Sequence, residues 1–397
     1  MSMNDSTLLK PGWTWVKFGD VVRLNTDRCA DPAGNGIERY VGLEHIEPED
    51  LRIRRWGLVA EGTTFTNRFQ PGQVLFGKRR AYQRKVAVAD FAGVCSGDIY
   101  VFEPKDERLL PELLPFLCQT ERFFEYAVGT SAGSLSPRTN WTQLANYEFA
   151  LPPLEEQQKI VELLQASLET VESYQSAYEV AENYLKSTRE YLFATDHTEN
   201  LPLSHMLSSI EAGKSLVAID QPPSEGRYAV LKVSAVGRNG FRSEETKTLV
   251  DQSAFLPEFS IKAGDLLITR ANTPDLVGMV CLVEQNYPNL MLSDKTLRLI
   301  PQKNVSPKLL HEAFWTAGVR QQLKSVATGT GAAMKNISQE KLQNLLIPLP
   351  PDVTENSAVL EQMRNARTIV NIIAERLRHI QKLHKALINR VTGMSNG

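Results

Sequence analysis

The sequence has few cysteines and no long hydrophobic run. Four cysteines occur in 397 residues, without C-x-x-C spacing and without clustered histidines. This pattern excludes a disulfide framework and a zinc motif, so we expect reduced, buried thiols and no metal site. No stretch approaches the roughly 18 apolar residues of a membrane span, and the N-terminus lacks the features of a secretory signal. We therefore expect a cytoplasmic protein that does not enter a membrane.

An excess of charge of either sign is also missing. Lys and Arg total 44 against 46 Asp and Glu, a formal net charge of −2, which argues against a uniformly basic nucleic-acid coat. The length exceeds that at which a single core stops growing, so two or more domains are expected. A content of 42% hydrophobic and 23% charged residues is ordinary for a globular protein and excludes a disordered chain.

Catalytic motifs are absent as well. The sequence has no G-x-x-x-x-G-K-[ST] phosphate loop, and the Pro-Pro pairs at 152–153 and 222–223 lack the Asn/Asp-Pro-Pro-aromatic form of amino-methyltransferases. The six histidines and the acidic residues form no pattern for acid–base or metal chemistry. We therefore predict that the chain is not an enzyme and holds no cofactor of its own.

The chain repeats itself internally. Residues 146–153 (NYEFALPP) lie over 344–351 (NLLIPLPP) at an offset of 198, and 71–76 lie over 263–268 at 192. Residues 96–98 lie over 293–295 at 197, and the order of the matches is kept. Such a duplication predicts two domain–helix units. The predicted segments are a first domain at 1–151, a long helix at 152–195, a second domain at 196–350 and a second long helix at 351–397.

Each predicted domain has short strands rich in Val, Ile, Leu and aromatic residues, separated by Gly and Pro. One helix is expected to interrupt the strands in each copy, at 111–126 in the first and 307–326 in the second. The predicted fold class is α+β, with two tandem α+β domains and an internal pseudo-twofold repeat.

The two long helices carry heptad patterns of apolar residues. Residues 154–193 contain no Gly or Pro and have a net charge of −5, whereas 355–391 have a net charge of +4. Opposite charges predict an antiparallel coiled coil between them, although separate packing of each helix on its neighbouring domain stays open. The residues expected at this interface are Ile160, Leu164, Val171, Tyr178, Leu185, Met363, Val370, Ile373, Leu377 and Ile380.

A locally basic stretch is hidden by the balanced total. Residues 52–90 contain nine Lys and Arg against two acids, a net charge of +7. Arg can form two hydrogen bonds with guanine, Gln or Asn can do so with adenine, and Lys can neutralise phosphates. The Gly/Ser-rich loops at 129–140 and 328–336 can hold phosphates through backbone N–H groups. The DNA-contacting candidates are Lys78, Arg79, Arg80, Tyr82, Gln83, Arg84, Lys85, Ser134, Arg138 and Asn140 in the first half, and Thr269, Arg270, Asn272, Lys335 and Asn336 in the second. A solvated charged hairpin and plain connecting loops are the alternatives.

Three motifs give a family resemblance. Residues 15–20 (WVKFGD) open the first half, 71–75 (PGQVL) lie within it, and 151–160 (LPPLEEQQKI) close it and begin the long helix. With the duplicated domain–helix plan, these motifs resemble the DNA-specificity subunit of type I restriction-modification systems. The second copy departs from the signature, with Asp352-Val353-Thr354-Glu355-Asn356 in place of the Glu-Gln run.

The resemblance implies a function for each part. Two target-recognition domains would each read one half of a bipartite site in double-stranded DNA, and the helices would set the spacer. The helices would also dock two modification subunits, which are adenine methyltransferases that use S-adenosylmethionine, and restriction subunits that use ATP and Mg²⁺ would join the complex. Two alternatives stay open: the specificity region of a single-chain restriction-methyltransferase enzyme, and a coiled-coil scaffold that does not bind DNA.

Overall fold

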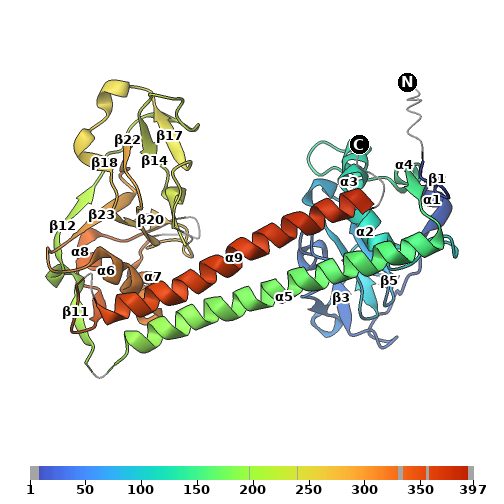
Figure 1. Ribbon diagram of the computed structural model, residues 1–397, viewed down its shortest axis with the longest axis horizontal. Helices are drawn as coiled ribbons and strands as arrows, with labels where there is room; N and C mark the ends of the chain where they lie inside the picture. Colours follow the sequence, from blue (N-terminus) through green and yellow to red (C-terminus); the bar gives the residue numbers. More distant parts are fainter. Residues whose placement is uncertain (1–8, 196, 239, 330–333, 355–356, 392–397) are drawn as a thin grey trace. The chain divides into compact units, whose positions relative to one another are not determined.

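The computed structural model describes residues 9–195, 197–238, 240–329, 334–354 and 357–391. It comprises two compact units, Met1–Gln175 with Glu375–Gly397 (unit 1) and Ser176–Ala374 (unit 2). Helices α5 (Leu154–Leu192) and α9 (Ala358–Val391) each contribute one segment to each unit (Figure 1). The boundaries predicted from the sequence separate the helices from the domains, whereas by compactness each unit includes a segment of both helices.

Unit 1 is built on two four-stranded sheets. The first is antiparallel, in the order β2 (Val22–Asn25), β9 (Ile99–Pro104), β6 (Val74–Gly77), β7 (Val86–Val88). The second has the order β4 (Gly57–Leu58), β3 (Arg39–Val41), β8 (Gly93–Cys95), β5 (Asn67–Phe69), with β3 and β8 parallel. A short pair of strands, β1 (Thr14–Lys17) and β10 (Glu148–Leu151), precedes α5. The helices are α1 (Phe18–Val21), α2 (Leu114–Gln119), α3 (Glu121–Gly129) and α4 (Trp141–Leu144).

The central strand β6 is buried on both faces because it lies between two cores. Val74 and Phe76 belong to the core shared with α2, α3 and α5, whereas Leu75 faces the core shared with Val41 and Phe69 of the second sheet. Alternate residues of a strand point to opposite faces, so a continuous apolar run marks a strand covered on both sides. The end of β6 is thereby held firmly where the chain emerges at Lys78.

Unit 2 repeats this plan. Its first sheet has the order β12 (Leu207–Ala212), β23 (Thr296–Pro301), β19 (Leu266–Thr269), β21 (Val280–Leu282). Its second has the order β13 (Ala218–Ile219), β17 (Thr246–Leu249), β14 (Ala229–Leu231), β22 (Tyr287–Met291), β18 (Ser260–Ile261), with β14 and β22 parallel. Short pairs of strands form sheets of their own: β11 (Glu199–Pro202) with β25 (Leu346–Leu349), β15 (Val236–Gly237) with β16 (Gly240–Phe241), and β20 (Ala271–Asn272) with β24 (Lys335–Asn336). The helices are α6 (Pro307–Phe314), α7 (Ala317–Val326) and α8 (Gln339–Gln343).

Strand register confirms the internal repeat. Phe76 pairs with Tyr100 in unit 1, and Ile268 pairs with Leu297 in unit 2. These pairs differ by 192 and 197 residues, the offsets expected from the sequence. The α+β fold with a duplicated plan is therefore correct.

The helix expected in each domain is broken in two. Thr120 separates α2 from α3 and caps α3, its Oγ1 accepting a hydrogen bond from Phe123 N. Thr316, at the equivalent place in unit 2, has the same extended backbone, with φ −65° and ψ 148°. The continuous helices predicted at 111–126 and 307–326 were therefore wrong, because a threonine with extended backbone ends one helix and begins the next.

The long helices run antiparallel within each unit. In unit 1 Ser167 of α5 lies beside His384 of α9, with Oγ and Nδ1 2.9 Å apart. In unit 2 Leu185 of α5 and Met363 of α9 belong to the same core. Of the ten residues predicted for the helix interface, six are buried and none is exposed; the half-buried ones are Val171, Tyr178, Ile373 and Ile380. The four cysteines are buried and free, as expected.

Candidate nucleic-acid interface

The chain that leaves β6 is fixed by main-chain hydrogen bonds. Lys78 N donates to Asp98 O (3.0 Å), and Lys78 O accepts from Thr139 N (2.8 Å). Arg80 N donates to Pro137 O (2.8 Å), and Arg79 forms a β-bridge with Arg138. The basic run after β6 and the Gly/Ser-rich loop, two separate candidates in the sequence, are therefore one site.

Asp98 organises the arginines of this site. Its Oδ1 accepts from Arg138 Nε (2.8 Å), and its Oδ2 accepts from Arg79 Nη1 (3.3 Å). Partial burial alone would raise the pKa of Asp98, but the hydrogen bonds and charges of Arg138 and Arg79 outweigh it and lower that pKa. Ser136 Oγ accepts from both Arg79 Nη2 and Arg80 Nη2, at 3.2 and 3.3 Å. Three guanidinium groups are thus held together by one carboxylate and one hydroxyl.

Lys78 lies over an aromatic ring at the same site. Its Nζ is 4.7 Å from the centre of the Tyr100 ring, a cation–π contact. The Tyr100 hydroxyl donates to Thr139 O and accepts from Trp141 N, each at 3.0 Å. Burial lowers the pKa of Lys78. Tyr100 therefore joins the strand β9 to the loop and supports the Lys78 ammonium.

Arg84 and Lys85 are engaged elsewhere. Arg84 has a side chain only 20% exposed, paired with Glu49 (2.8 Å) and Glu121 (2.7 Å) and lying over the Phe124 ring. Lys85 Nζ donates to Leu43 O at 2.6 Å. These two side chains hold the domain together, so we no longer include them among the proposed DNA contacts.

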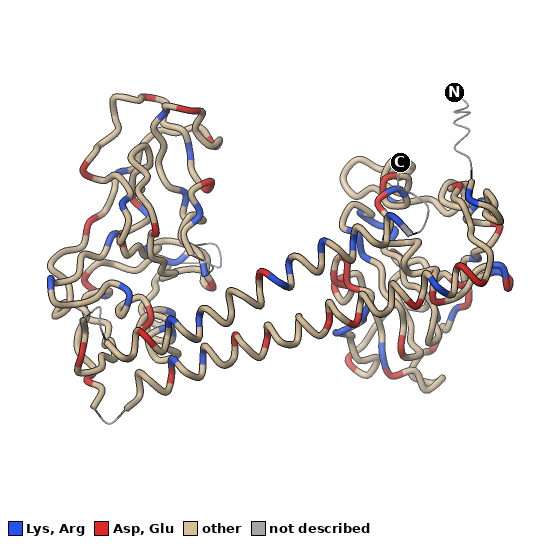
Figure 2. The backbone as a smooth tube through the Cα atoms, viewed as in Figure 1, with Lys and Arg blue, Asp and Glu red and all other residues tan. Residues whose placement is uncertain are grey.

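The net charge of +7 in residues 52–90 is largely balanced by neighbouring acids. Arg54 pairs with Asp50 (2.6 Å), and ion pairs join Arg52 to Glu172 and Arg55 to Glu47. Figure 2 shows acidic positions interspersed among the basic ones in unit 1. Counting residues within one segment missed these partners because they come from other segments.

The remaining unit 1 candidates lie around the arginine cluster. Tyr82 is exposed and Gln83 half-buried, both in a single 3-10 turn, Ala81–Gln83, between residues with left-handed backbone. Ser134 is exposed in the loop, and Asn140 caps α4 through a hydrogen bond from Thr142 N. Leu135, at 90% exposure, is the most exposed large apolar side chain among the described residues.

Unit 2 has the same main-chain arrangement with different side chains. Arg270 N donates to Lys295 O (2.9 Å), and Arg270 O accepts from Ile337 N (2.8 Å). Ala271 pairs with Asn336, and Asn272 with Lys335. Arg270 thus takes the place of Lys78, and Lys295 that of Asp98. The carboxylate that organises unit 1 is replaced by an exposed lysine.

Four of the unit 2 candidates lie at this position and one is buried beneath it. Arg270 is half-buried, Asn272 Oδ1 accepts from Thr273 N, Lys335 Nζ donates to Gly329 O, and Asn336 is exposed. Thr269 is buried, and its Oγ1 donates to Leu276 O and accepts from Met279 N, both at 3.0 Å. We therefore remove Thr269 from the proposed DNA contacts. Residues 330–333 of the loop lie outside the described residues.

Sequence reasoning missed Asp98, Ser136, Leu135 and Lys295. An acidic residue in a predicted DNA interface carries no positive signal, and Leu135 has no charge. The alignment of 96–98 with 293–295 nevertheless contained the Asp98–Lys295 exchange, once the repeat was known.

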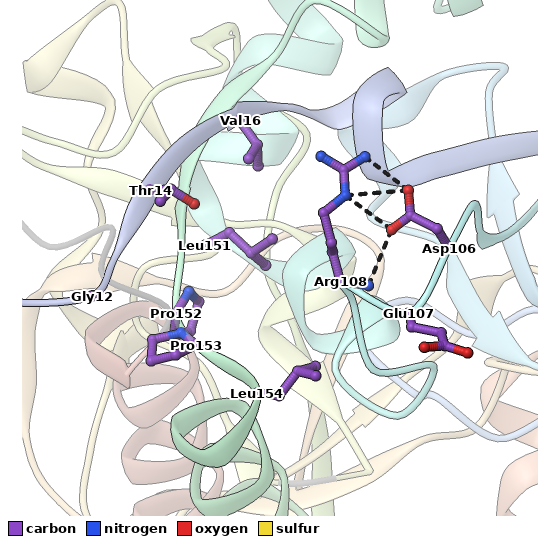
Figure 3. A pocket seen from close by; sticks show the side chains of 10 residues that line it. All are labelled: Gly12, Thr14, Val16, Asp106, Glu107, Arg108, Leu151, Pro152, Pro153 and Leu154. Carbon is purple, nitrogen blue, oxygen red and sulfur yellow. Dashed lines mark hydrogen bonds and ion pairs between the residues drawn. The ribbon is translucent and has the colours of Figure 1, made fainter.

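A cavity of about 770 Å³ lies beside the start of α5 (Figure 3). Its lining residues are Gly12, Thr14, Val16, Asp106, Glu107, Arg108, Leu151, Pro152, Pro153 and Leu154. Arg108 and Asp106 bind each other on one wall, with Nη2 and Oδ2 2.8 Å apart. The walls are otherwise mostly apolar, and none of the DNA-contacting candidates lines it.

The signature residues after the two prolines fix the start of α5. Gln157 is fully buried: its Nε2 donates to Arg108 O (2.7 Å) and Pro152 O (2.9 Å), and its Oε1 accepts from Leu110 N (2.9 Å). Glu156 accepts from Trp13 Nε1 at 2.7 Å. The Glu-Gln pair of the motif therefore joins the helix to the body of the domain.

Two further observations concern the described residues. No three His, Cys, Asp or Glu side chains among them gather as they would around a metal ion. None of the described helices is long and apolar enough to cross a membrane.

Known proteins share both sequence and fold with this chain. Residues 11–182 match the family of the type I restriction modification DNA specificity domain. The type I restriction enzyme EcoEI specificity subunit of Escherichia coli is 22% identical, over 97% of this chain and 82% of that protein. The EcoDI specificity subunit of Escherichia coli is 26% identical, over 56% of this chain and 52% of that protein.

Solved structures extend the likeness to the fold. A chain from a structure of the type I restriction-modification system, described for its assembly and conformational transition, covers 98% of this chain and 99% of its own length, with a TM-score of 0.57 at 22% identity. The type I S subunit from M. genitalium covers 99% and 97%, with a TM-score of 0.52 at 13% identity. The predicted resemblance is thereby confirmed: this chain is related along almost its whole length to the DNA-specificity subunits of type I restriction-modification systems, and residues 11–182 match the specificity domain of that family.

Proposed function

We propose that this chain is a specificity subunit in which each unit reads one half of a bipartite site in double-stranded DNA. The observation that carries the proposal is the pair of equivalent sites after β6 and β19. Their main-chain hydrogen bonds are the same, while their polar side chains differ. Two domains that read different DNA sequences need this combination of a constant main-chain arrangement and side chains that differ.

In unit 1 the reading group best placed for a base is Arg138. Its side chain is 53% exposed and binds Asp98 through Nε, so neither terminal amino group takes part in that contact. Two parallel N–H donors suit guanine O6 and N7 in the major groove. Arg79 and Arg80, joined through Ser136, add positive charge for phosphates.

In unit 2 the site is built from amides and lysines. Asn272 and Asn336 lie on the paired strands β20 and β24, and an Asn side chain can form two hydrogen bonds with adenine. Lys295 and Lys335 supply positive charge, and Lys295 stands where unit 1 has Asp98. Unit 2 is therefore expected to read a different half-site from unit 1.

Leu135 adds an apolar contact to the unit 1 site. It follows Ser134 and precedes Ser136, the residue that holds two arginines. An apolar side chain beside phosphate-binding cations can contact a thymine methyl group or enter between base steps. We assign this role to Leu135.

The long helices are proposed to set the spacer and to dock two modification subunits. With 39 residues, α5 is about 60 Å long at 1.5 Å per residue. In unit 2 it exposes Val180, Tyr184 and Tyr191 at helical spacing, and α9 exposes Ile369 and Ile372. Exposed apolar residues on one helix face are suited to pack against a partner protein.

The chain itself is proposed to be non-catalytic and cytoplasmic. S-adenosylmethionine would belong to the modification subunits, and ATP and Mg²⁺ to the restriction subunits. Methyl transfer to adenine requires the base to leave the helix, a step we assign to the modification partner.

Footprinting on random duplexes, with and without modification subunits, tests the proposal. Two protected patches separated by an unread spacer are expected. The purified chain, incubated alone with DNA, Mg²⁺ and S-adenosylmethionine, should neither cut nor methylate. Cleavage or methylation by the chain alone would favour the single-chain enzyme, and no protection under any condition would favour a scaffold that does not touch DNA.

Deleting one matched heptad from each helix tests the spacer. Residues 173–179 and 372–378 occupy corresponding positions in the repeat, so their joint removal keeps the helix pairing in register. The preferred spacer should shorten while both half-sites stay the same. An unchanged spacer would separate spacer choice from helix length.

A further inference from the structure

In both units a short helix binds a segment of a long helix in the same way, but the side chains beside this contact are apolar in unit 1 and charged in unit 2. In unit 1 Glu121 N donates to Asn389 Oδ1 of α9 (2.9 Å), and in unit 2 Ala317 N donates to Glu190 Oε1 of α5 (2.7 Å). These hydrogen bonds show that α9 in unit 1 corresponds to α5 in unit 2, with an offset of 199 between the two helices. The offset for the short helices α3 and α7 is 196.

These offsets identify three corresponding positions in each unit, where the short helix packs against the two long helices. In unit 1 they are Phe116, Leu168 and Ile388; in unit 2 they are Glu312, Arg367 and Arg189. The same alignment places Leu164 on Met363, both deeply buried. Every apolar residue of the first set thus corresponds to a charged residue of the second.

The unit 2 set forms an ion triad around a buried carboxylate, in which Arg189 is buried and the Arg367 side chain is 40% exposed. Glu312, whose side chain is 7% exposed, lies between the two arginines. Its Oε2 is 3.0 Å from Arg189 Nη2 of α5, and its Oε1 pairs with Arg367 of α9. His311 Nδ1 is 3.6 Å from the same Oε1. One carboxylate on α6 therefore binds both helix segments.

The unit 1 set is apolar. Phe116 and Ile388 are buried in one core, and Leu168 packs against it. His384 of α9 lies at the edge of the Phe116 ring, 6.4 Å between ring centres. No acid stands among these three positions, so an arginine placed there would be buried without a partner.

We infer that this exchange of chemistry specifies which helix end closes which unit, and so enforces pairing of the two different halves of the chain. If two first halves paired, Arg189 would meet Phe116 and Leu168; if two second halves paired, Ile388 would leave Glu312 with only one arginine. The first mismatch buries an arginine without a carboxylate, which is strongly destabilising. The second removes one of the two ion pairs of Glu312 and leaves the pair with Arg367. The helix charges act in the same direction, because −5 meets +4 only in the mixed pair. The pairing rule itself does not depend on the proposed function. Its use, which is to bring two domains that read different DNA sequences together on one molecule, rests on that function.

The test exchanges the triads in the full-length chain and follows amide hydrogen exchange without DNA. I388R should speed exchange in the last turns of α9 by at least about a hundredfold, because it buries an unpaired guanidinium. The triple variant F116E/L168R/I388R rebuilds the ion triad and should restore most of the protection. I388M is the matched control of similar size without charge, and should behave like the original chain.

The reciprocal exchange tests unit 2. R189I should loosen the end of α5, and R189I/E312F/R367L should restore it with the apolar set. Rescue by both triple variants supports the inference, even if a single variant unfolds its unit. Unchanged exchange in I388R, or triple variants no better protected than the single ones, would overturn it. Since no DNA is present, neither result depends on whether the chain reads DNA.

Discussion

The Asp98 carboxylate holds Arg138 through Nε at 2.8 Å, which fixes the plane of the guanidinium while leaving its terminal amino groups out of the contact. The two residues are 40 positions apart and meet because the loop after α3 forms a β-bridge with the chain after β6. Under the proposed function, Asp98 positions the guanidinium and Arg138 contacts the base.

Replacing Arg138 should damage one half-site only. R138A is expected to cost about 1–3 kcal/mol at one base pair of the first half-site, since a lost bidentate contact costs that much. R138K keeps the charge and should lose nearly as much discrimination, because a lysine lacks the planar pair of donors. Methylation of a library of duplexes by the reconstituted complex measures both. R108A, which removes an equally exposed arginine at the cavity, should leave the preference unchanged.

Asp98 should matter through Arg138 rather than through DNA. D98N removes the charge that orients two arginines, so base preference should broaden while affinity for nonspecific DNA stays the same or rises. Binding measured over a series of salt concentrations separates the two effects. Sharpened base preference in D98N would contradict this role.

Arg84 should contribute to stability and not to base preference. Its ion pairs with Glu49 and Glu121 and its contact with Phe124 lie within the domain, so R84A should lower the free energy of unfolding by about 1–3 kcal/mol. Denaturant unfolding measures the loss. The R84A protein that remains folded should read the same half-site as the original chain. An altered half-site would show that Arg84 belongs to the DNA interface.

Leu135 should affect DNA binding without affecting folding. At 90% exposure it contributes no core packing, so L135S should unfold at the same temperature as the original chain. Its affinity for the specific duplex should fall while nonspecific affinity changes little. V217S, which removes a 79% exposed apolar side chain of unit 2 that is not a DNA-contacting candidate, serves as control. Equal specific affinity for L135S and the original chain would remove Leu135 from the interface.

Glu312 should make stability depend on pH in the acid range. Burial opposes its ionisation, but His311, Arg367 and Arg189 outweigh burial and lower its pKa from 4.5 to about 2. A lowered folded pKa means that the stabilisation is complete above about pH 4.5 and is lost as the pH falls toward 2. It amounts to on the order of 3 kcal/mol.

Denaturant unfolding of the original chain and E312Q between pH 6 and pH 2 checks this dependence. The stability difference between them should shrink over that window. E340Q, which removes an exposed carboxylate of α8, is the control, and its stability should follow that of the original chain at every pH. A difference that stays constant with pH would contradict the lowered pKa.

The sequence predicted the parts of the fold that depend on local pattern. Heptads without Gly or Pro predicted α5 and α9, and the repeat offsets of 192 and 197 reappear in the strand register. The break at Thr120 was missed, because a single threonine inside an apolar pattern does not show whether its backbone is helical or extended. The ion partners of the basic segment were missed for another reason. Glu121 and Glu172 come from distant segments, and nearness in space could not be known before the fold.

The main-chain bonds around Lys78 and Arg270 have a consequence for how such a protein can change what it recognises. The loops at both sites are held by amide and carbonyl groups, which every residue except proline supplies in full. Side chains at 79, 98 and 138, or at 271, 295 and 336, can be exchanged without loss of the bonds that place them. New half-sites are therefore accessible by point substitution, one unit at a time, while the long helices and their exposed surfaces stay unchanged.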